Sequence, residues 1–171
     1  MEPKLDAKDR AILSIIQRDC KLTSREIARE INSPITTVFA KIRRMEELGI
    51  IRNYRATLDP KKLGYEATAL ILASVSYGSK DNESRVSQRE IAENIARFPE
   101  VQEVHIITGE WDLLIKLRTK SVDAMGKFVI DKLRLIKGIE KTLTCMVFET
   151  TKETTELYID LRKDKTINSR C

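Results

Sequence analysis

Residues 33–49 read SPITTVFAKIRRMEELG and carry the marks of one short helix at both ends. Ser33 is a good N-cap, Pro34 suits the first helical position, and Gly49 can close the helix in the left-handed conformation. An apolar stripe at spacings of four and three predicts the side that packs on a core: Val38, Ile42 and Met45. The opposite face carries Thr36, Ala40, Arg43, Arg44 and Glu47. Small and cationic side chains suit a helix that reads DNA, although a solvated surface helix shows the same pattern.

Two further helices are predicted before this stretch. The first covers residues 6–19, with Asp6 as its cap. The second begins at Thr23, which forms a capping box with Glu26. Only the short turn 32–34 separates the second helix from the third. A packing helix followed by two short helices and a tight turn is helix-turn-helix organisation.

Residues 50–58 follow as a short strand or a pair of strands. Arg52 and Arg55 would then lie beside the third helix, as on a wing that touches the DNA backbone. The alternative is a strand that merely closes the small core, and the two readings are compatible with each other. Pro60 and Gly64 mark residues 59–64 as a linker, after which the apolar period changes from helical to extended.

The charge of the chain is unevenly distributed. Residues 1–64 hold 14 Lys and Arg against nine Asp and Glu, whereas residues 65–171 hold 17 of each. The whole net charge of +5 therefore lies in the first third of the chain. This asymmetry predicts a basic module that faces a polyanion such as double-stranded DNA, joined to a neutral module with another task.

The remainder predicts the strand and helix order β-α-β-β-α-β of a ferredoxin-like domain, residues 65–161. The strands are expected at 65–77, 101–108, 113–119 and 140–149, and the helices at 87–98 and 121–136. A polar loop is expected at 78–84, a further short edge or exchange strand at 157–161, and a disordered tail at 162–171.

Both faces of the predicted sheet are apolar. In the first strand, Leu70 and Leu72 lie on the side opposite to Ile71. In the last strand, Leu143 and Cys145 likewise share one side. Because both crossovers put their helices on one face, the other face needs a cover. The simplest cover is the same sheet of a second copy, so we predict a symmetric dimer.

The residues of catalytic and metal sites are scarce. The sequence has none of the common nucleotide-, zinc- or serine-hydrolase motifs, and His105 is its one histidine. The three cysteines lack metal-site spacing. We therefore expect no enzyme, no metal and no cofactor. No apolar run is long enough for a membrane span, and the first residues do not resemble a signal peptide, so a cytoplasmic protein is expected.

The turn 108–112 is the candidate small-molecule site. Gly109 frees backbone amides for an anionic group such as a carboxylate, Trp111 offers apolar contact, and Asp112 could pair with an ammonium group or fix the turn. An ordinary hairpin turn with a glycine and a turn-forming aspartate accounts for the same residues.

These motifs together resemble the Lrp/AsnC (feast/famine) family of transcription regulators. The matching pieces are Leu5-Asp6 through Asp9 with Ile12-Leu13, residues 24–31, residues 33–51, Leu58-Asp59-Pro60 with Leu63-Gly64, residues 101–104 and residues 108–113. The resemblance extends to about residue 161. It implies a winged helix-turn-helix, residues 1–58, followed by a ferredoxin-like (RAM-type) effector and assembly domain.

The resemblance also implies an amino acid as effector and dimers that assemble into octamers. The expected effector residues are Thr108, Gly109, Glu110, Trp111, Asp112, Thr142 and Thr144. The expected DNA-binding residues are Thr36, Thr37, Ala40 and Arg43 for base edges, and Ser33, Lys41, Arg44, Arg52 and Arg55 for phosphates. Two alternatives stay open: a sirohaem-decarboxylase-like enzyme of the same architecture, and an assembly module that does not bind DNA.

Overall fold

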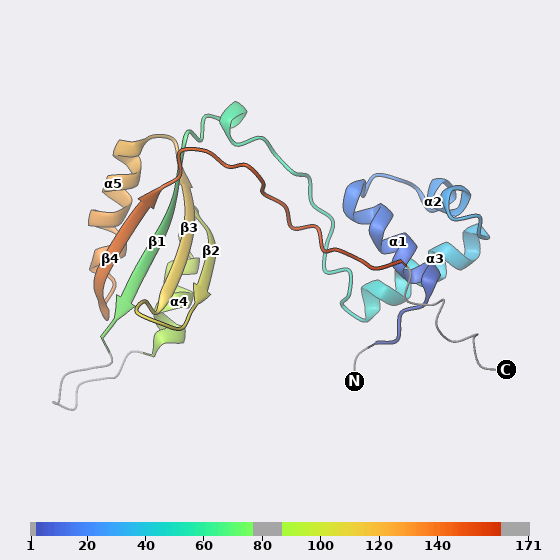
Figure 1. Cartoon of the computed structure of the whole chain (residues 1–171), viewed down its shortest axis with the longest axis horizontal. Helices are drawn as coiled ribbons and strands as arrows, with labels where there is room; N and C mark the ends of the chain where they lie inside the picture. Colours follow the sequence, from blue (N-terminus) through green and yellow to red (C-terminus); the bar gives the residue numbers. More distant parts are fainter. Residues whose placement is uncertain (1–2, 77–86, 162–171) are drawn as a thin grey trace. The chain divides into compact units, whose positions relative to one another are not determined.

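The computed structural model describes residues 3–76 and 87–161, which fold as two compact units. The first unit is Met1–Thr57 with Lys152–Cys171, and the second is Leu58–Thr151. The first unit is helical, and the second is built on a β-sheet with helices (Figure 1). The loop predicted at 78–84 and the tail predicted at 162–171 lie outside the described residues. The predicted domain bounds 1–58, 59–64 and 65–161 stay predictions.

The first unit contains α1 (Ala7–Arg18), α2 (Ser24–Glu30) and α3 (Ile35–Glu47). Both predicted caps are confirmed: Asp6 and Asp9 form a capping box on α1, and Thr23 and Glu26 form one on α2. These boxes satisfy amides of the first helical turn that have no partner inside the helix.

A small core joins the three helices. It consists of Ile12, Ile15, Ile27, Ala28, Val38 and Met45, with Ile42 packed against it. The predicted inner stripe of α3 is thereby confirmed.

The start of α3 differs from the prediction. Pro34 is the N-cap, since its ψ of 141° is not helical, and no side chain of the described residues caps this helix. Ser33 Oγ instead accepts a hydrogen bond from Lys8 Nζ at 3.1 Å. Asn32 takes the left-handed conformation (φ 47°) that makes the turn from α2 tight.

Two predicted strands are absent among the described residues. Residues 50–58 and 157–161 contain no strand. A strand requires hydrogen bonds to a neighbouring strand. The sequence pattern of these two segments does not indicate whether a neighbouring strand is present. Tyr54 O–H holds the first segment to α3 by a 2.8 Å bond to Glu46. Gln17 of α1 holds the second segment at Leu157.

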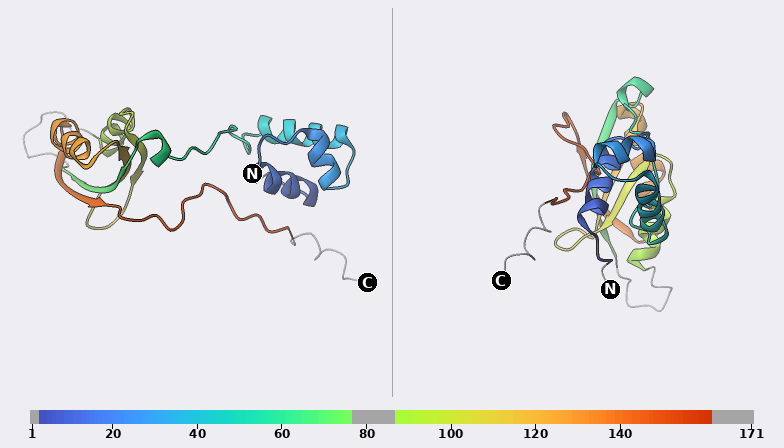
Figure 2. Two further views of the ribbon diagram at one scale, coloured as in Figure 1. Left: turned by 90° about the horizontal axis from the view of Figure 1, so that it is seen from above. Right: turned by 90° about the vertical axis from the view of Figure 1, so that its right-hand side faces the viewer.

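The second unit has the predicted ferredoxin-like order. It comprises η1 (Lys61–Leu63), β1 (Ala67–Val75), α4 (Gln88–Ala96), β2 (Val101–Ile106), β3 (Leu113–Thr119), α5 (Val122–Asp131), η2 (Leu133–Leu135) and β4 (Ile139–Met146). The strands pair antiparallel in the order β2-β3-β1-β4, and both helices cover one face of the sheet (Figures 1 and 2). The helix predicted at 121–136 ends at Asp131 because Lys132 has a φ of −121°.

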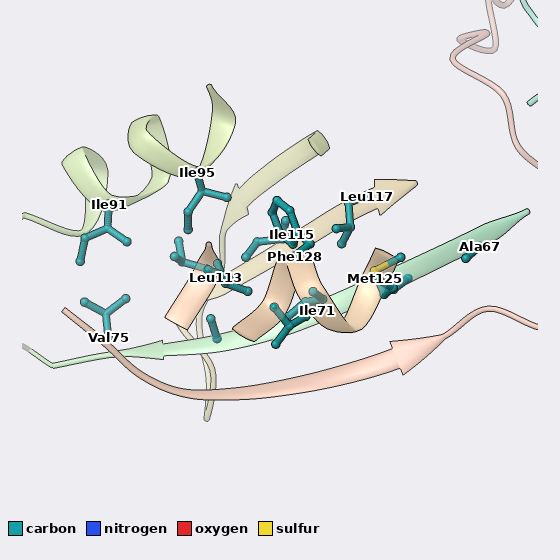
Figure 3. Packing of buried hydrophobic residues seen from close by; sticks show 14 residues of the cluster. Ala67, Ile71, Val75, Ile91, Ile95, Leu113, Ile115, Leu117, Met125 and Phe128 are labelled. Atoms are coloured by element: carbon teal, nitrogen blue, oxygen red, sulfur yellow. The ribbon is translucent and has the colours of Figure 1, made fainter. Parts of the chain in front are cut away.

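The core of this unit lies between the helices and the sheet (Figure 3). Every second residue of β1 and β3 is buried there, as alternation along a strand requires. Ile91 and Ile95 of α4 and Met125 and Phe128 of α5 meet them. Each large side chain removed from water in this way contributes about 1.5–3 kcal/mol.

Among the described residues, no helix covers the opposite face of the sheet. Leu70 and Leu143 there are 38% and 46% exposed, and Leu72, Leu114 and Cys145 lie beside them by register. No helix among the described residues is long and apolar enough to cross a bilayer.

Candidate functional site

The outer face of α3 points away from the core of the first unit. Thr36, Ala40 and Arg43 are exposed, and Thr37 is half-buried at one flank. Arg43 Nε donates to Glu47 Oε1 at 3.0 Å, with both side chains about two-thirds exposed. An exposed pair of this kind contributes little to stability, so Arg43 can exchange Glu47 for another acceptor.

Two apolar side chains lie beside this face and were missed by the sequence reasoning. Ile35 and Phe39, one turn apart on α3, are 46% and 58% exposed. The sequence signal was present, because neither residue belongs to the inner stripe that contains Val38 and Met45.

The α2–α3 turn forms a basic hollow of about 610 Å³. Its lining is Arg25, Ala28, Arg29, Asn32, Ser33, Pro34 and Ile35. Arg25 and Arg29 lie one turn apart on α2 and are exposed. The hollow opens at the start of α3, where free backbone amides and the helix dipole favour an anion. These two arginines were not predicted, although their spacing of four places them on one face.

Lys41 is largely buried and paired with two carboxylates. Its side chain is 17% exposed, and its Nζ donates to Asp6 Oδ2 at 2.5 Å and to Asp9 Oδ1 at 3.0 Å. Burial lowers the pKa of Lys41, but the two hydrogen bonds and the two negative charges outweigh it and raise the pKa. The charge of Lys41 is thus compensated by two carboxylates in the DNA-free chain, and its predicted phosphate contact stays a prediction.

The other predicted cations remain accessible. Arg44 is about half exposed, with Nη1 3.5 Å from Asp9 Oδ2 and Nη2 donating to the carbonyl of Lys4 at 3.3 Å. Arg52 and Arg55 are exposed on the extended segment after α3. Partial burial, followed by the hydrogen bond to Glu46 and its charge, raises the pKa of Tyr54 in this segment to about 12.

The turn between β2 and β3 is held by Asp112. The Ile107 N–H donates to the Asp112 carbonyl at 2.9 Å, and the Asp112 N–H donates to Ala73 of β1 at 3.0 Å. Its carboxylate accepts from the Val75 N–H at 2.7 Å, and Gln88 Nε2 donates to its carbonyl at 3.1 Å. Of the two roles considered for Asp112, the structure shows the one that fixes the turn.

The rest of this turn is open. Thr108, Gly109 and Glu110 are exposed, and Gly109 has a φ of 119°. Apart from its two chain neighbours, no described residue has a heavy atom within 4 Å of where a Cβ on Gly109 would stand. Lys141 of β4 places its Nζ 5.0 Å from the centre of the Trp111 ring, a cation–π contact that was not predicted.

Thr142 and Thr144 are farther from the turn than expected. They pair with Ala73 and Ile71 and so lie on the helix-covered side of β4. Strand β1 lies between β4 and β3, so these two strands are about 10 Å apart. Thr142 Oγ1 accepts from Arg134 Nε at 3.4 Å. The single chain thus brings Trp111 and Lys141 together, but not the two threonines with the turn.

Other candidate chemistry is sparse in the part of the chain that the structure describes. His105 is exposed on β2, and its Nε2 is 3.2 Å from Glu103 Oε2. Residues 3–76 and 87–161 contain no group of three metal-ligating side chains.

Comparison with known proteins matches both units to family models. Residues 5–52 match a winged helix-turn-helix DNA-binding model, and residues 71–157 match the Lrp/AsnC ligand binding domain. An uncharacterised HTH-type transcriptional regulator of Pyrococcus horikoshii is 41% identical over 87% of this chain and 96% of its own. The HTH-type transcriptional regulator FL11 of the same organism is 38% identical over 93% of this chain and 99% of its own.

Two solved structures of transcription regulators have a similar fold. The transcriptional regulator NMB0573 of Neisseria meningitidis, solved as a complex with L-Met, superposes with a TM-score of 0.83 at 26% identity, covering 92% of this chain and 98% of that one. AsnC of E. coli gives a TM-score of 0.79 at 25% identity, covering 90% and 99%.

Proposed function

The chain belongs to the Lrp/AsnC family of transcription regulators, and on that basis we propose how its two units divide the work. It is a DNA-binding transcription regulator with a ligand-binding domain. The first unit reads an operator through α3. The second unit binds an amino acid and joins copies of the chain. We place the protein in the cytoplasm, where it acts as a regulator and not as an enzyme.

The outer face of α3 supports direct reading of bases. An α-helix fits the major groove, and the small side chains of Thr36, Thr37 and Ala40 allow close approach. Arg43 can donate two hydrogen bonds to one guanine, the commonest specific contact of this kind. Ile35 and Phe39, exposed beside it, would contact thymine methyl groups.

The basic hollow beside α3 is the proposed phosphate site. Arg25, Arg29 and Ser33 line it, and the free amides at the start of α3 face the same ligand. Arg44, Arg52 and Arg55 would contact phosphates farther along the strand. Confinement of the net charge to residues 1–64 is the observation that carries this proposal most strongly, since phosphate contacts dominate the affinity for DNA.

Selection of genomic fragments by the purified chain tests the proposal and supplies the operator. Arg43→Ala should then lower operator affinity about tenfold or more and relax the preference at one base pair. Arg29→Ala should weaken operator and random DNA by similar factors and reduce the slope of log affinity against log salt by about 0.9. Arg97→Ala, an exposed arginine of the second unit, is the control and should change neither.

The effector proposal rests on the open turn at 108–112. Exposed backbone around Gly109 offers amides to a carboxylate, and Lys141 adds a cation that lies over the neutral Trp111 ring. The relative from Neisseria meningitidis was solved with L-Met, so an amino acid is the effector class that we propose for this chain. Because Thr142 and Thr144 lie a strand away, they would contribute only if another copy of the chain completes the site.

The uncovered sheet face supports a dimer. Leu70, Leu72, Leu114, Leu143 and Cys145 form an apolar surface that a second copy would cover by its own identical face. A two-fold dimer presents two copies of α3, which fits a roughly palindromic operator. Octamers built from such dimers are the further assembly that we propose.

A further inference from the structure

Asp9 is a buried carboxylate at the junction of α1 and α3. Its side chain is 1% exposed, although aspartate is among the residue types least often buried. A buried charge persists in a fold only where partners compensate it. Asp9 has such partners both at the start of α1 and on α3.

The contacts of Asp9 are specific. Oδ1 accepts from Lys41 Nζ at 3.0 Å, and Oδ2 accepts from the Asp6 N–H at 3.0 Å. Arg44 Nη1 lies 3.5 Å from the same Oδ2. Asp6 adds a second carboxylate to Lys41 at 2.5 Å. Two acids from the start of α1 therefore hold two cations of α3.

Lys41 and Arg44 are three residues apart and lie along one edge of α3. This edge borders the face that carries Ala40 and Arg43. A rotation of α3 about its own axis would lengthen both ion pairs at once, and the same rotation would turn different side chains toward the DNA bases. The angle of the reading face is thus tied to the pairing at Asp9.

We propose that Asp9 is a positioning residue that fixes the rotation of α3 and thereby the operator specificity. This inference rests on the proposed reading of bases by α3. It assigns Lys41 to positioning, in contrast to the phosphate contact that its charge suggested. Loss of the Asp9 charge should then lower the specificity for the operator and raise the affinity for non-specific DNA.

The opposite directions follow from charge. Asp9→Asn keeps an oxygen that can accept the Asp6 N–H, but it removes the charge that holds Lys41 and Arg44. Arg44 then has no carboxylate partner from α1 and Lys41 keeps only Asp6, so both cations are freer to meet phosphates of any sequence, which strengthens non-specific binding. The loosened helix discriminates the operator less well. Simple destabilisation would weaken the binding of both kinds of DNA together.

The experiment compares the full chain and Asp9→Asn on two duplexes of equal length, the selected operator and a scrambled one, by fluorescence anisotropy. Circular dichroism at the assay temperature confirms that each variant is folded. In Asp9→Asn the ratio of operator affinity to scrambled-duplex affinity should fall about tenfold or more, while the affinity for the scrambled duplex rises. An unchanged ratio, or equal losses on both duplexes, overturns the proposal.

Asp19→Asn is the matched control, because Asp19 is an exposed aspartate at the other end of α1 and the charge change is the same. Its ratio should stay within twofold of the wild-type value.

Lys41→Gln keeps the test decisive if Asp9→Asn does not fold. If Lys41 positions α3, this variant should have a lower ratio of operator affinity to scrambled-duplex affinity. The slope of log affinity against log salt on the scrambled duplex should not change. A slope reduced by about 0.9 would make Lys41 a phosphate contact and overturn the proposal. If the wild-type chain selects no operator at all, the proposed function fails, which is a separate result.

Discussion

Asp112 Oδ2 accepts a hydrogen bond from the backbone N–H of Val75 at 2.7 Å, so the β2–β3 turn is attached by a side chain to the end of β1. Gln88 at the start of α4 binds the carbonyl of the same residue at 3.1 Å. The turn proposed to bind the effector is therefore anchored at Asp112, whereas Thr108, Gly109 and Glu110 in the same turn are exposed.

Asp112→Ala should destabilise the second unit by about 1–3 kcal/mol, because the amide of the buried Val75 loses its acceptor. The melting temperature of a unit of this size should fall by several degrees, since each 1 kcal/mol corresponds to about 4–8 °C. Calorimetry measures this. Glu110→Ala, an exposed acid in the same turn, is the control, and an equal effect from both variants would contradict the role given to Asp112.

Acid stability should depend on Asp6. Burial alone would raise the pKa of Asp6, but hydrogen bonds from Lys41 and the Asp9 N–H lower it from 3.8 to about 2. A lowered folded pKa gives stability that is present above pH 3.8 and lost as the pH falls toward 2. Asp6→Asn should therefore lose less stability than the wild type between pH 5 and pH 2 in urea unfolding. Identical pH dependence of the two proteins would rule this out.

Gln17 should hold the segment after β4 on α1. Its Oε1 accepts from the Leu157 N–H at 2.8 Å, and its Nε2 donates to the Leu157 carbonyl at 3.1 Å. Gln17→Ala should speed hydrogen exchange of the Leu157 amide several-fold, because exchange follows local opening. Gln17→Glu keeps the acceptor and should give an intermediate rate. A rate unaffected by either change would show that other contacts hold the segment.

Leu143→Arg should produce monomers. Leu143 is 46% exposed in the single chain, so the substitution leaves its fold intact but places charge in the proposed interface. Sedimentation equilibrium at micromolar concentration measures the mass. Leu135→Arg alters a leucine that is 76% exposed on the helix-covered side and should remain dimeric. A monomeric wild-type chain would refute the dimer, and a dimeric Leu143→Arg would move the interface elsewhere.

The helices could be predicted because their signals are local. Thr23 and Glu26 cap α2 within four residues, and the stripe from Val38 to Met45 lies within one helix. The order of the four strands followed from alternation and from the helices between them. The predicted end of α5 was nevertheless wrong. The backbone departs from helical geometry at Lys132, where the sequence has no proline or glycine to indicate a helix end.

The failures concern partners distant in sequence. The ion pairs of Lys41 were not predicted, because its partners Asp6 and Asp9 precede it by 35 and 32 residues. A charge pattern cannot show which cations are already paired inside the fold. No strand forms at 50–58 or 157–161 in the single chain for the same reason, since a strand exists only where another strand pairs with it. The contact between Lys141 and Trp111 likewise depends on β4 lying next to β1.

The measurement that tests the coupling of the two units most directly is operator affinity with and without effector in Gly109→Arg. The probes are L-methionine and each of the other standard L-amino acids at millimolar concentration. Open space around Gly109 accommodates the new side chain, and Gly109→Ala carries the same strain at a φ of 119° without its bulk and charge. We expect one amino acid to change the affinity of the wild-type chain about fivefold or more.

Gly109→Ala should keep much of that response. Gly109→Arg should lose it, while its operator affinity without amino acid stays within twofold of the wild-type value. An operator affinity of Gly109→Arg that still shifts as in the wild-type chain would contradict the effector site at this turn.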